Sequence, residues 1–224
     1  MRLTERSPDH FNKYAVMADH DYVDWVFTER RAMDSKGLWR SNVFKVAEET
    51  PVDLEIGVGN GYFFEHLCAM NPERRQLGIE IKFKQLIQTT KRTLKRGCEN
   101  GRLVRFDAGE LEQIFGPAEL NDVYIFFPDP WPKKRHHKNR LITYNFLMTL
   151  FELQRPGSCV QFKTDSREYF DWIMERVPKT PYVIEAKSDD LHVSGLAQDN
   201  FRTHFENLWT GKGLKTNYLL LRKS

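Results

Sequence analysis

Four acidic residues stand in or directly after short apolar runs, where they could build a binding site. Glu55 lies inside "VDLEIGVG", Glu80 follows "QLGI", Asp107 follows "LVRF" and Asp129 comes shortly after "VYIFF". Each run has the length and composition of a buried strand. In a parallel sheet the carboxyl ends of the strands meet at one edge, where ligands bind. We therefore expect the four carboxylates to surround one crevice.

The first of these strands ends in three glycines, Gly57, Gly59 and Gly61. Glycine permits a tight turn and lets backbone N–H groups approach a ligand closely. The spacing GxGxG is neither the dinucleotide fingerprint GxGxxG nor part of a phosphate-binding GxxxxGK[ST] loop. A plain strand–helix turn would explain the glycines, and helix capping would explain Glu80 and Asp107 taken singly. The combination favours a site.

S-adenosylmethionine fits this combination better than a dinucleotide does. It has a ribose diol, an ammonium group and a sulfonium, all of which suit carboxylates, and it has no phosphate. A dinucleotide would require a cradle for its pyrophosphate at the helix N-terminus. The sequence therefore predicts S-adenosylmethionine as cofactor, bound by seven residues: Glu55, Gly57, Gly59, Gly61, Glu80, Asp107 and Asp129.

The stretch "IFFPDPWPKKRHHKNRL" places a carboxylate in a stiff loop. Pro128 and Pro130 bracket Asp129, and each proline fixes its own φ and pushes the preceding residue toward extended backbone. Stiffness suits a group that must hold its position during a reaction, so we predict Asp129 to be catalytic. Trp131 offers a face on which a base could stack, although a hydrophobic plug over the strand end is an equal alternative.

A block of cations follows this loop: Lys133, Lys134, Arg135, Lys138 and Arg140. The formal net charge is only +3, so any nucleic-acid affinity must come from local clustering, and a second basic series lies on the helix expected after Glu80. Cations beside one crevice would attract phosphates. His136 and His137 are weak candidates for a general base, and no metal site is expected because the three cysteines are far apart without a CxxC pair.

From residue 51 onward, apolar runs alternate with amphipathic helical segments. This order predicts an α/β fold, a Rossmann-like doubly wound sheet of seven strands, mostly parallel with a late antiparallel edge strand. We expect helices over 62–74, 83–97, 139–157 and 166–177. Residues 1–50 show no clear period and are expected to form a partly flexible extension with a possible RNA contact, preceding a methyltransferase domain over 51–224. The chain opens without an apolar signal region and has no membrane-length apolar run, so a cytoplasmic location is expected.

The motifs "DLEIGVGNG", "GIEI", "FDA", "FFPDPWPKKRHHKNRL", "FKTD" and "RTHFE" occur in an order and spacing similar to the tRNA (guanine-N7-)-methyltransferase family. The resemblance covers about three quarters of the chain. It implies methyl transfer from S-adenosylmethionine to N7 of a variable-loop guanine in tRNA. Because N7 carries an exposed in-plane lone pair, we expect in-line transfer without a general base. The resemblance also implies tRNA as the partner, no membrane, and a monomer or homodimer. The residues that the resemblance assigns to the substrate are Lys133, Asp165, Thr203 and Glu206, with RNA contacts at Lys134, Arg135, His136, Lys138 and Arg140.

Other readings stay open at the level of the sequence. One is a methyltransferase of the same fold that acts on another RNA or on a small molecule, although a neutral metabolite would gain nothing from the cations. Enzymes that methylate exocyclic amines carry an Asn/Asp-Pro-Pro-aromatic loop, whereas here Asp129-Pro130 is followed by Trp131. A non-catalytic RNA-binding protein would not need the set of acids.

Overall fold

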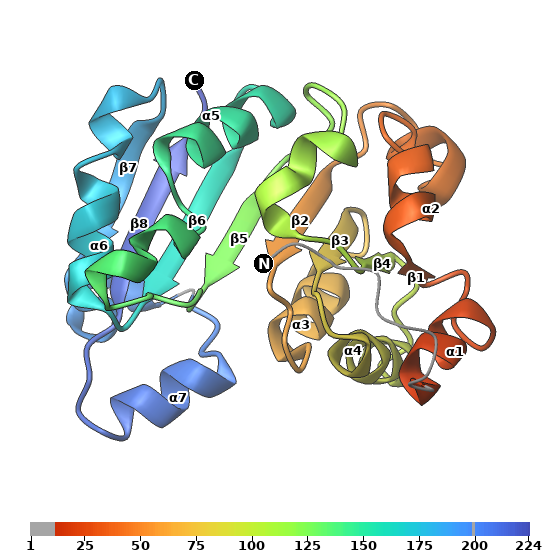
Figure 1. The fold of residues 1–224 in the computed structure, drawn as a ribbon, viewed down its shortest axis with the longest axis horizontal. Helices are drawn as coiled ribbons and strands as arrows, with labels where there is room; N and C mark the ends of the chain where they lie inside the picture. The colour runs from red at the N-terminus through yellow and green to blue at the C-terminus, as the bar shows by residue number, and fades with distance from the viewer. Residues whose placement is uncertain (1–11, 199) are drawn as a thin grey trace. The chain divides into compact units, whose positions relative to one another are not determined.

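The computed structural model describes residues 12–198 and 200–224. Its chain forms two compact units: unit 1 ends at Glu119, and unit 2 is Leu120–Ser224. Figure 1 shows the helices and strands of both, coloured along the chain. Within the described ranges, no helix combines the length and the apolar character needed to cross a membrane.

Unit 1 contains four parallel strands in the order β1-β4-β3-β2: β1 (Val26–Phe27), β4 (Gly101–Val104), β3 (Arg75–Ile79) and β2 (Val52–Ile56). All five residues of β2 are buried. Strands covered on both faces are typical of parallel sheets in α/β proteins. In the register of β2 and β3, Glu55 lies opposite Gly78.

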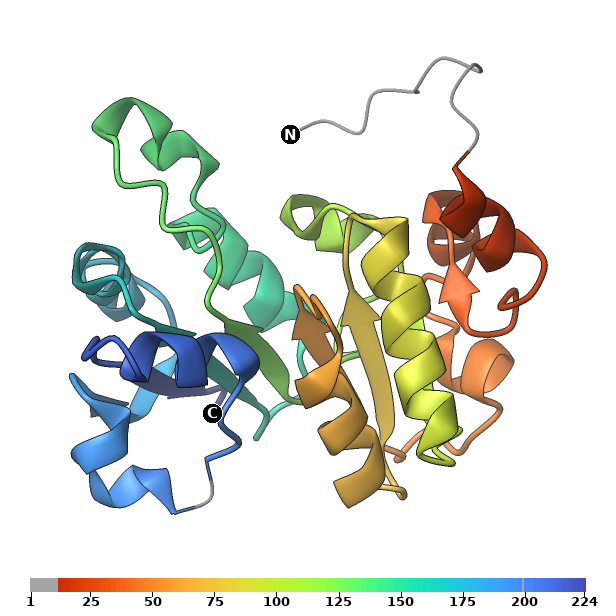
Figure 2. The same ribbon diagram turned by 90° about the horizontal axis from the view of Figure 1, so that it is seen from below.

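Two helices, α3 (Tyr62–Met70) and α4 (Phe83–Lys95), lie side by side against these strands (Figure 2). Phe64 from α3 and Leu86 from α4 are fully buried in one core cluster. The Phe64 ring fills the space beside two glycines, because a Cβ at Gly78 or Gly101 would meet it at 2.9 Å. The helices therefore sit close to the strands that end in the candidate site.

Residues 12–50 are built into unit 1 through α1 (Lys13–Asp19), β1, α2 (Glu29–Asp34) and the π-helix η1 (Trp39–Phe44). Trp39 is 0% exposed, and its indole N–H donates to the carbonyl of Ile114 at 2.8 Å. The Glu119 carboxylate accepts from the backbone N–H groups of Trp39 and Gly37 at 2.9 and 2.8 Å. Residues 1–11 of the expected extension lie outside the described residues, and the RNA contact of that segment stays a prediction.

Unit 2 contains β5 (Val123–Phe126), β6 (Cys159–Thr164), β8 (Asn217–Arg222) and β7 (Val183–Ser188), in that order. Strands β5 and β6 are parallel, whereas β8 is antiparallel to both β6 and β7. The late antiparallel strand is thus confirmed. It lies between β6 and β7, so the edge position in this unit belongs to β7.

The helices of unit 2 are α5 (Tyr144–Leu153), α6 (Arg167–Met174) and α7 (His204–Thr210), with short 3₁₀ turns between them. The helix expected over 139–157 is shorter at both ends than the sequence predicts. Thr143 caps α5 by accepting from the N–H of Phe146 at 3.2 Å, and the preceding residues form the separate 3₁₀ helix η3 (Lys134–Asn139). At the other end, Gln154 is extended and pairs with Leu120.

The α/β class with a mostly parallel arrangement is confirmed. The described residues contain eight strands, one more than the seven predicted. The additional strand is the two-residue β1, which lies before residue 51, where no strand pattern is apparent in the sequence.

Candidate functional site

The glycine turn after β2 has the backbone that its sequence predicts. Gly57, Gly59 and Gly61 all have positive φ, at +82°, +52° and +76°. The N–H of Gly57 donates to the Ile79 carbonyl at 2.8 Å, which ties the turn to the end of β3. A Cβ on Gly57 would meet no atom within 4 Å, so the turn is open on that side.

Helix α4 holds the other side of the turn. A Cβ on Gly61 would lie 2.3 Å from the Thr89 hydroxyl, so only glycine fits against this helix. That hydroxyl donates to the Gly59 carbonyl at 3.3 Å. Arg92 donates from Nε to the Asn60 carbonyl at 3.2 Å. Part of the basic series on α4 thus braces the turn, a role that the sequence does not reveal.

Glu55 is buried at the end of β2, and within the described part of the chain its carboxyl group lacks a hydrogen-bond partner at one oxygen. It is 5% exposed, and among the described residues its Oε2 atom has no hydrogen-bond partner. Burial and, to a smaller extent, the nearby Glu80 carboxylate together raise the pKa of Glu55 to about 8. A buried polar atom without a partner costs free energy, so its retention points to a ligand group that completes it.

Glu80 and Asp107 are engaged with backbone. Glu80 accepts from the N–H groups of Ile81 and Lys82 at 2.9 and 3.1 Å and from the N–H of Gly59 at 3.3 Å. Asp107 caps the 3₁₀ helix η2 (Ala108–Gln113) by accepting from Gly109 at 2.9 Å. Helix capping therefore explains one hydrogen bond of the Asp107 carboxylate. The side chains of Glu80 and Asp107 both remain partly exposed.

These residues fit the cofactor that the sequence predicts. A buried unpartnered carboxylate suits a donor of hydrogen bonds or positive charge, and the open glycine turn leaves room for a bound molecule. Of the seven predicted cofactor residues, six lie in unit 1, at or after the carboxyl ends of β2, β3 and β4. Asp129 belongs to unit 2.

In unit 2, Asp129 follows β5 in a loop where two other residues have strained backbone dihedral angles. Its carboxylate is exposed, and Phe127 and Trp131 on either side have positive φ, at +52° and +45°. The Trp131 ring meets the His136 ring edge-on at 5.8 Å between centroids. The loop is thus shaped by more than its prolines.

The cations of this segment, predicted to contact RNA or, for Lys133, the substrate, differ in exposure, and His136, also predicted to contact RNA, is half-buried. Lys133, Lys134, Arg135 and Lys138 are exposed on or beside η3, in the green segment that extends away from the strands of unit 2 in Figure 2. Arg140 differs, since it is 3% exposed. Its Nε donates to the Pro130 carbonyl at 2.8 Å, and its Nη2 to Glu168 at 2.8 Å. A guanidinium buried in this way supports the Asp129 loop, and its contact with RNA stays a prediction.

The other predicted substrate residues also differ in burial and hydrogen bonding. Asp165, after β6, is half-buried, and no interaction of its carboxylate is found among the described residues. Thr203 and Glu206 form a capping box at the start of α7: Glu206 N–H donates to the Thr203 hydroxyl at 3.1 Å, and Thr203 N–H to Glu206 Oε2 at 3.3 Å. Figure 1 shows α7 at the end of unit 2 toward which β5 and β6 run.

Glu206 is the centre of a buried polar cluster. It is 0% exposed and accepts from Lys163 Nζ at 3.1 Å and Asn200 Nδ2 at 2.6 Å, with His192 Nε2 at 3.1 Å. Lys163 also donates to the Phe201 carbonyl at 3.0 Å, and burial lowers the pKa of its ammonium. The capping pattern Thr-x-x-Glu was available in the sequence as a helix signal. The contacts of Lys163 were not, because they join residues far apart in the chain.

The comparisons with known proteins agree on the class. The family described as "Putative methyltransferase" matches residues 49–219. The tRNA (guanine-N(7)-)-methyltransferase of Bdellovibrio bacteriovorus is 41% identical over 203 residues, covering 91% of this chain and 97% of the relative. The enzyme of the same name from Bacillus subtilis is 35% identical, over 80% of this chain and 83% of its own.

Solved structures share the fold at low identity. The 16S rRNA methyltransferase KamB has a TM-score of 0.57 and 12% identity, over 88% of this chain and 94% of its own. A methyltransferase from Streptococcus mutans, solved in complex with SAH, has a TM-score of 0.51 and 10% identity, over 78% and 89%. These similarities confirm the Rossmann-like fold. The identity to the curated relatives over most of the chain shows that the chain belongs to the tRNA (guanine-N7-)-methyltransferase family.

Proposed function

We propose that this chain transfers a methyl group from S-adenosylmethionine to N7 of a guanine in tRNA, at the variable loop. The observation that best supports the proposal is the 41% identity with the Bdellovibrio bacteriovorus enzyme across 91% of the chain. A cytoplasmic location, where tRNA is found, stays a prediction.

In unit 1, the open glycine turn and Glu55 would hold the cofactor, with Glu80 and Asp107 beside it. When bound, S-adenosylmethionine would supply the methyl group and a positive charge. A carboxylate that is buried and unpartnered favours a cation or a hydroxyl donor in its neighbourhood. The fixed backbone of the turn, braced by Thr89, keeps that surface in place.

In unit 2, Asp129 would orient the guanine. N7 carries an in-plane lone pair, so no base has to remove a proton from it, and the main task is alignment. A carboxylate can accept from the guanine N1–H and the exocyclic amine, a pattern that adenine lacks. Asp165 can serve the same purpose, since no hydrogen bond or ion pair of its carboxylate is found among the described residues. The exposed cations beside η3 would bind the phosphates of tRNA.

The experiment is transfer of tritiated methyl to unmodified tRNA transcripts, followed by cleavage at 7-methylguanine. We expect labelled tRNA with one cleavage site in the variable loop. Label in ribosomal RNA or a small acceptor, but not in tRNA, would contradict the proposal.

Asp129→Asn supplies the matched test of the catalytic role. It preserves the shape of an exposed side chain while removing its charge. We expect kcat to fall by about 100-fold, in the range found when an oriented or electrostatic contact is lost. The unfolding midpoint should not change. Near-normal turnover would mean that another group orients the guanine, and Asp165→Asn would then be examined in the same assay.

A further inference from the structure

The loop that carries Asp129 is held in a backbone conformation that it would not keep alone. Phe127 and Trp131 are not glycines, yet both have φ in the left-handed region, at +52° and +45°. Such residues persist only where the surrounding structure fixes them. Pro128 and Pro130 restrict the intervening backbone, because each proline fixes its own φ.

Arg140 supplies that contact from the far end of η3. Its side chain is 1% exposed. Its Nε donates to the carbonyl of Pro130, the residue directly after Asp129, at 2.8 Å. Its guanidinium carbon lies 5.2 Å from the Tyr169 ring centroid and 4.9 Å from that of Trp172. The charged end therefore stacks on two aromatic side chains of α6 while it binds the loop.

Glu168 on α6 completes this contact. Its Oε1 accepts from Arg140 Nη2 at 2.8 Å and lies 3.2 Å from His137 Nε2. The hydrogen bond from Arg140 lowers the pKa of the Glu168 carboxyl, so the carboxylate stays ionised at neutral pH. The Glu168 carboxylate thus fixes Arg140 by a hydrogen bond and lies near His137, whose ring packs edge-on against the Trp172 ring of α6 at 5.3 Å between centroids.

The two ends of the segment are also attached to neighbouring elements. The N–H of Phe127 donates to the Lys163 carbonyl on β6 at 2.8 Å. The N–H of Ile142 donates to the Tyr169 hydroxyl at 3.0 Å. Between these points, Arg140 and Glu168 provide the charged link that ties the loop backbone to α6.

We propose that Arg140 and Glu168 are positioning residues that hold the Asp129 loop in its reactive shape. This inference rests on the proposed function, in which Asp129 orients the guanine. The cations that would bind phosphates, such as Lys134 and Lys138, are exposed and separate from this link. Loss of the link therefore lowers the rate of the chemical step and leaves tRNA binding in place.

The test is Glu168→Gln, with Asp171→Asn as its matched control. Both acids lie on α6, both are more than half exposed, and both pair with an arginine at 2.8 Å: Glu168 with Arg140, and Asp171 with Arg167. We expect Glu168→Gln to lower kcat about 10- to 100-fold with a KM for tRNA within about twofold of the wild type. Asp171→Asn should leave both constants unchanged.

Limited trypsin digestion gives a second measurement that does not depend on catalysis. The chain offers cleavage sites at Lys133, Lys134, Arg135 and Lys138, next to the loop. A loosened segment is cut faster, so Glu168→Gln should be cleaved there several times faster than Asp171→Asn. Arg140→Lys keeps the charge but cannot bind Pro130 and Glu168 in the same geometry, and it should behave like Glu168→Gln.

The outcomes separate the two proposals. Wild-type kcat and wild-type cleavage in Glu168→Gln would overturn the positioning role, as would a raised KM with an unchanged kcat. A wild-type protein that transfers no methyl to tRNA would instead overturn the proposed function, and faster cleavage of the variant would then still show that Glu168 holds the loop.

Discussion

At the scale of single residues, Glu55 has the most unusual chemistry. Its pKa of about 8 means that the carboxyl is mostly protonated at neutral pH, because burial disfavours the ionised form. A bound cofactor with a positive charge would favour the carboxylate and lower this pKa. Binding should therefore release a proton from Glu55, whereas a carboxyl group with an ordinary pKa is already ionised at neutral pH.

We predict the release of close to one proton per cofactor bound at pH 7, with S-adenosylmethionine added to the wild-type protein. Isothermal calorimetry in two buffers of different ionisation enthalpy measures it. Glu55→Gln should abolish the release and weaken binding, whereas Glu73→Gln, an exposed acid of the same unit, should change neither. Equal proton release from Glu55→Gln and the wild type would contradict the assignment.

The same raised pKa predicts how stability depends on pH. Between pH 4.5 and about 8 the folded protein binds the Glu55 proton more tightly than the unfolded chain does. The contribution of Glu55 to stability is then fully present below pH 4.5, and it falls by about 1.4 kcal/mol per pH unit as the pH rises through this window. Urea unfolding should show Glu55→Gln gaining stability relative to the wild type as the pH rises, and parallel curves would contradict the prediction.

At the scale of elements, the sequence predicts what local patterns determine. The strands β2 to β6 and the glycine turn lie where the apolar runs and Gly57 to Gly61 place them. The sequence alone could not predict that β8 lies between β6 and β7, because strand order depends on pairing between distant segments. Nor could it predict the burial of Arg140, because a run of cations is most often a solvated surface. Glu206 was assigned to substrate by resemblance, and the structure shows its side chain fully buried in the first turn of α7.

The packing of α4 against the glycine turn can be measured with two alanine substitutions. Gly61 and Gly97 have nearly equal φ, at +76° and +78°, but a Cβ at Gly61 would meet Thr89 at 2.3 Å and a Cβ at Gly97 would meet nothing within 4 Å. Gly97→Ala should therefore cost only the backbone strain, about 1–2 kcal/mol. Gly61→Ala should cost clearly more and should also weaken cofactor binding. Equal losses in urea unfolding would mean that α4 moves aside.

The buried pair at the start of α7 leads to a second prediction at this scale. Glu206→Gln leaves the Lys163 ammonium buried without a charge partner, which should cost about 3–5 kcal/mol. The double variant Lys163→Met with Glu206→Gln removes the stranded charge and should recover part of that loss. Thermal unfolding measures both, with the exposed neighbour Phe205→Ala as the control. If Glu206 acted only on the substrate, Glu206→Gln would lower activity while the stability stayed unchanged.

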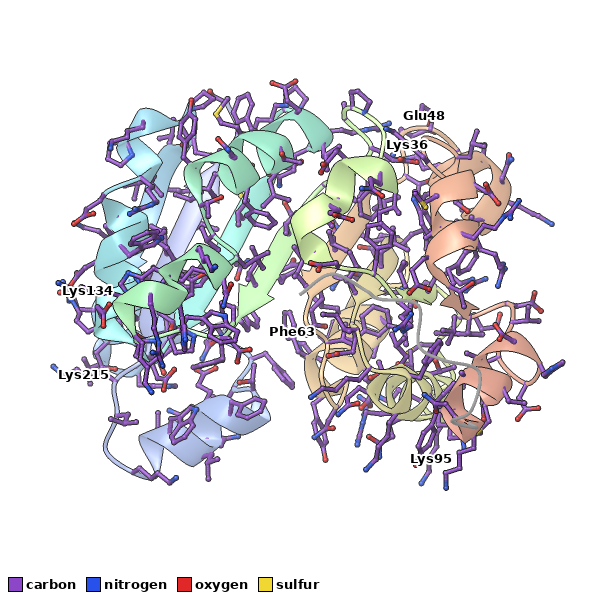
Figure 3. All side chains as sticks on the ribbon, viewed as in Figure 1. Lys36, Glu48, Phe63, Lys95, Lys134 and Lys215 are labelled. Carbon is purple, nitrogen blue, oxygen red and sulfur yellow. The ribbon has the colours of Figure 1, made fainter. Side chains whose placement is uncertain are left out.

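At the scale of the whole molecule, the formal net charge of +3 is too small to explain binding to a polyanion. The argument for tRNA therefore depends on where the charge lies. Four exposed cations lie beside one loop: Lys133, Lys134, Arg135 and Lys138. Figure 3 labels Lys134, and it also labels Lys36, an exposed lysine that follows α2 in unit 1. A local cluster should make binding depend on salt through a few specific phosphate contacts.

Two variants with the same total charge separate local from global electrostatics. Changing Lys133, Lys134, Arg135 and Lys138 to Ala takes the formal net charge from +3 to −1 by removing four cations, and so does changing Lys36, Lys45, Lys179 and Lys187. Each phosphate contact contributes about 0.7–0.9 to the slope of log K against log salt, so the first variant should lose about 3 from that slope. The second should bind tRNA with nearly the wild-type slope, because its lysines are scattered over the chain. Filter binding over a series of KCl concentrations measures both, and equal slopes for the two variants would mean that net charge, and not the cluster after Asp129, draws the RNA to the protein.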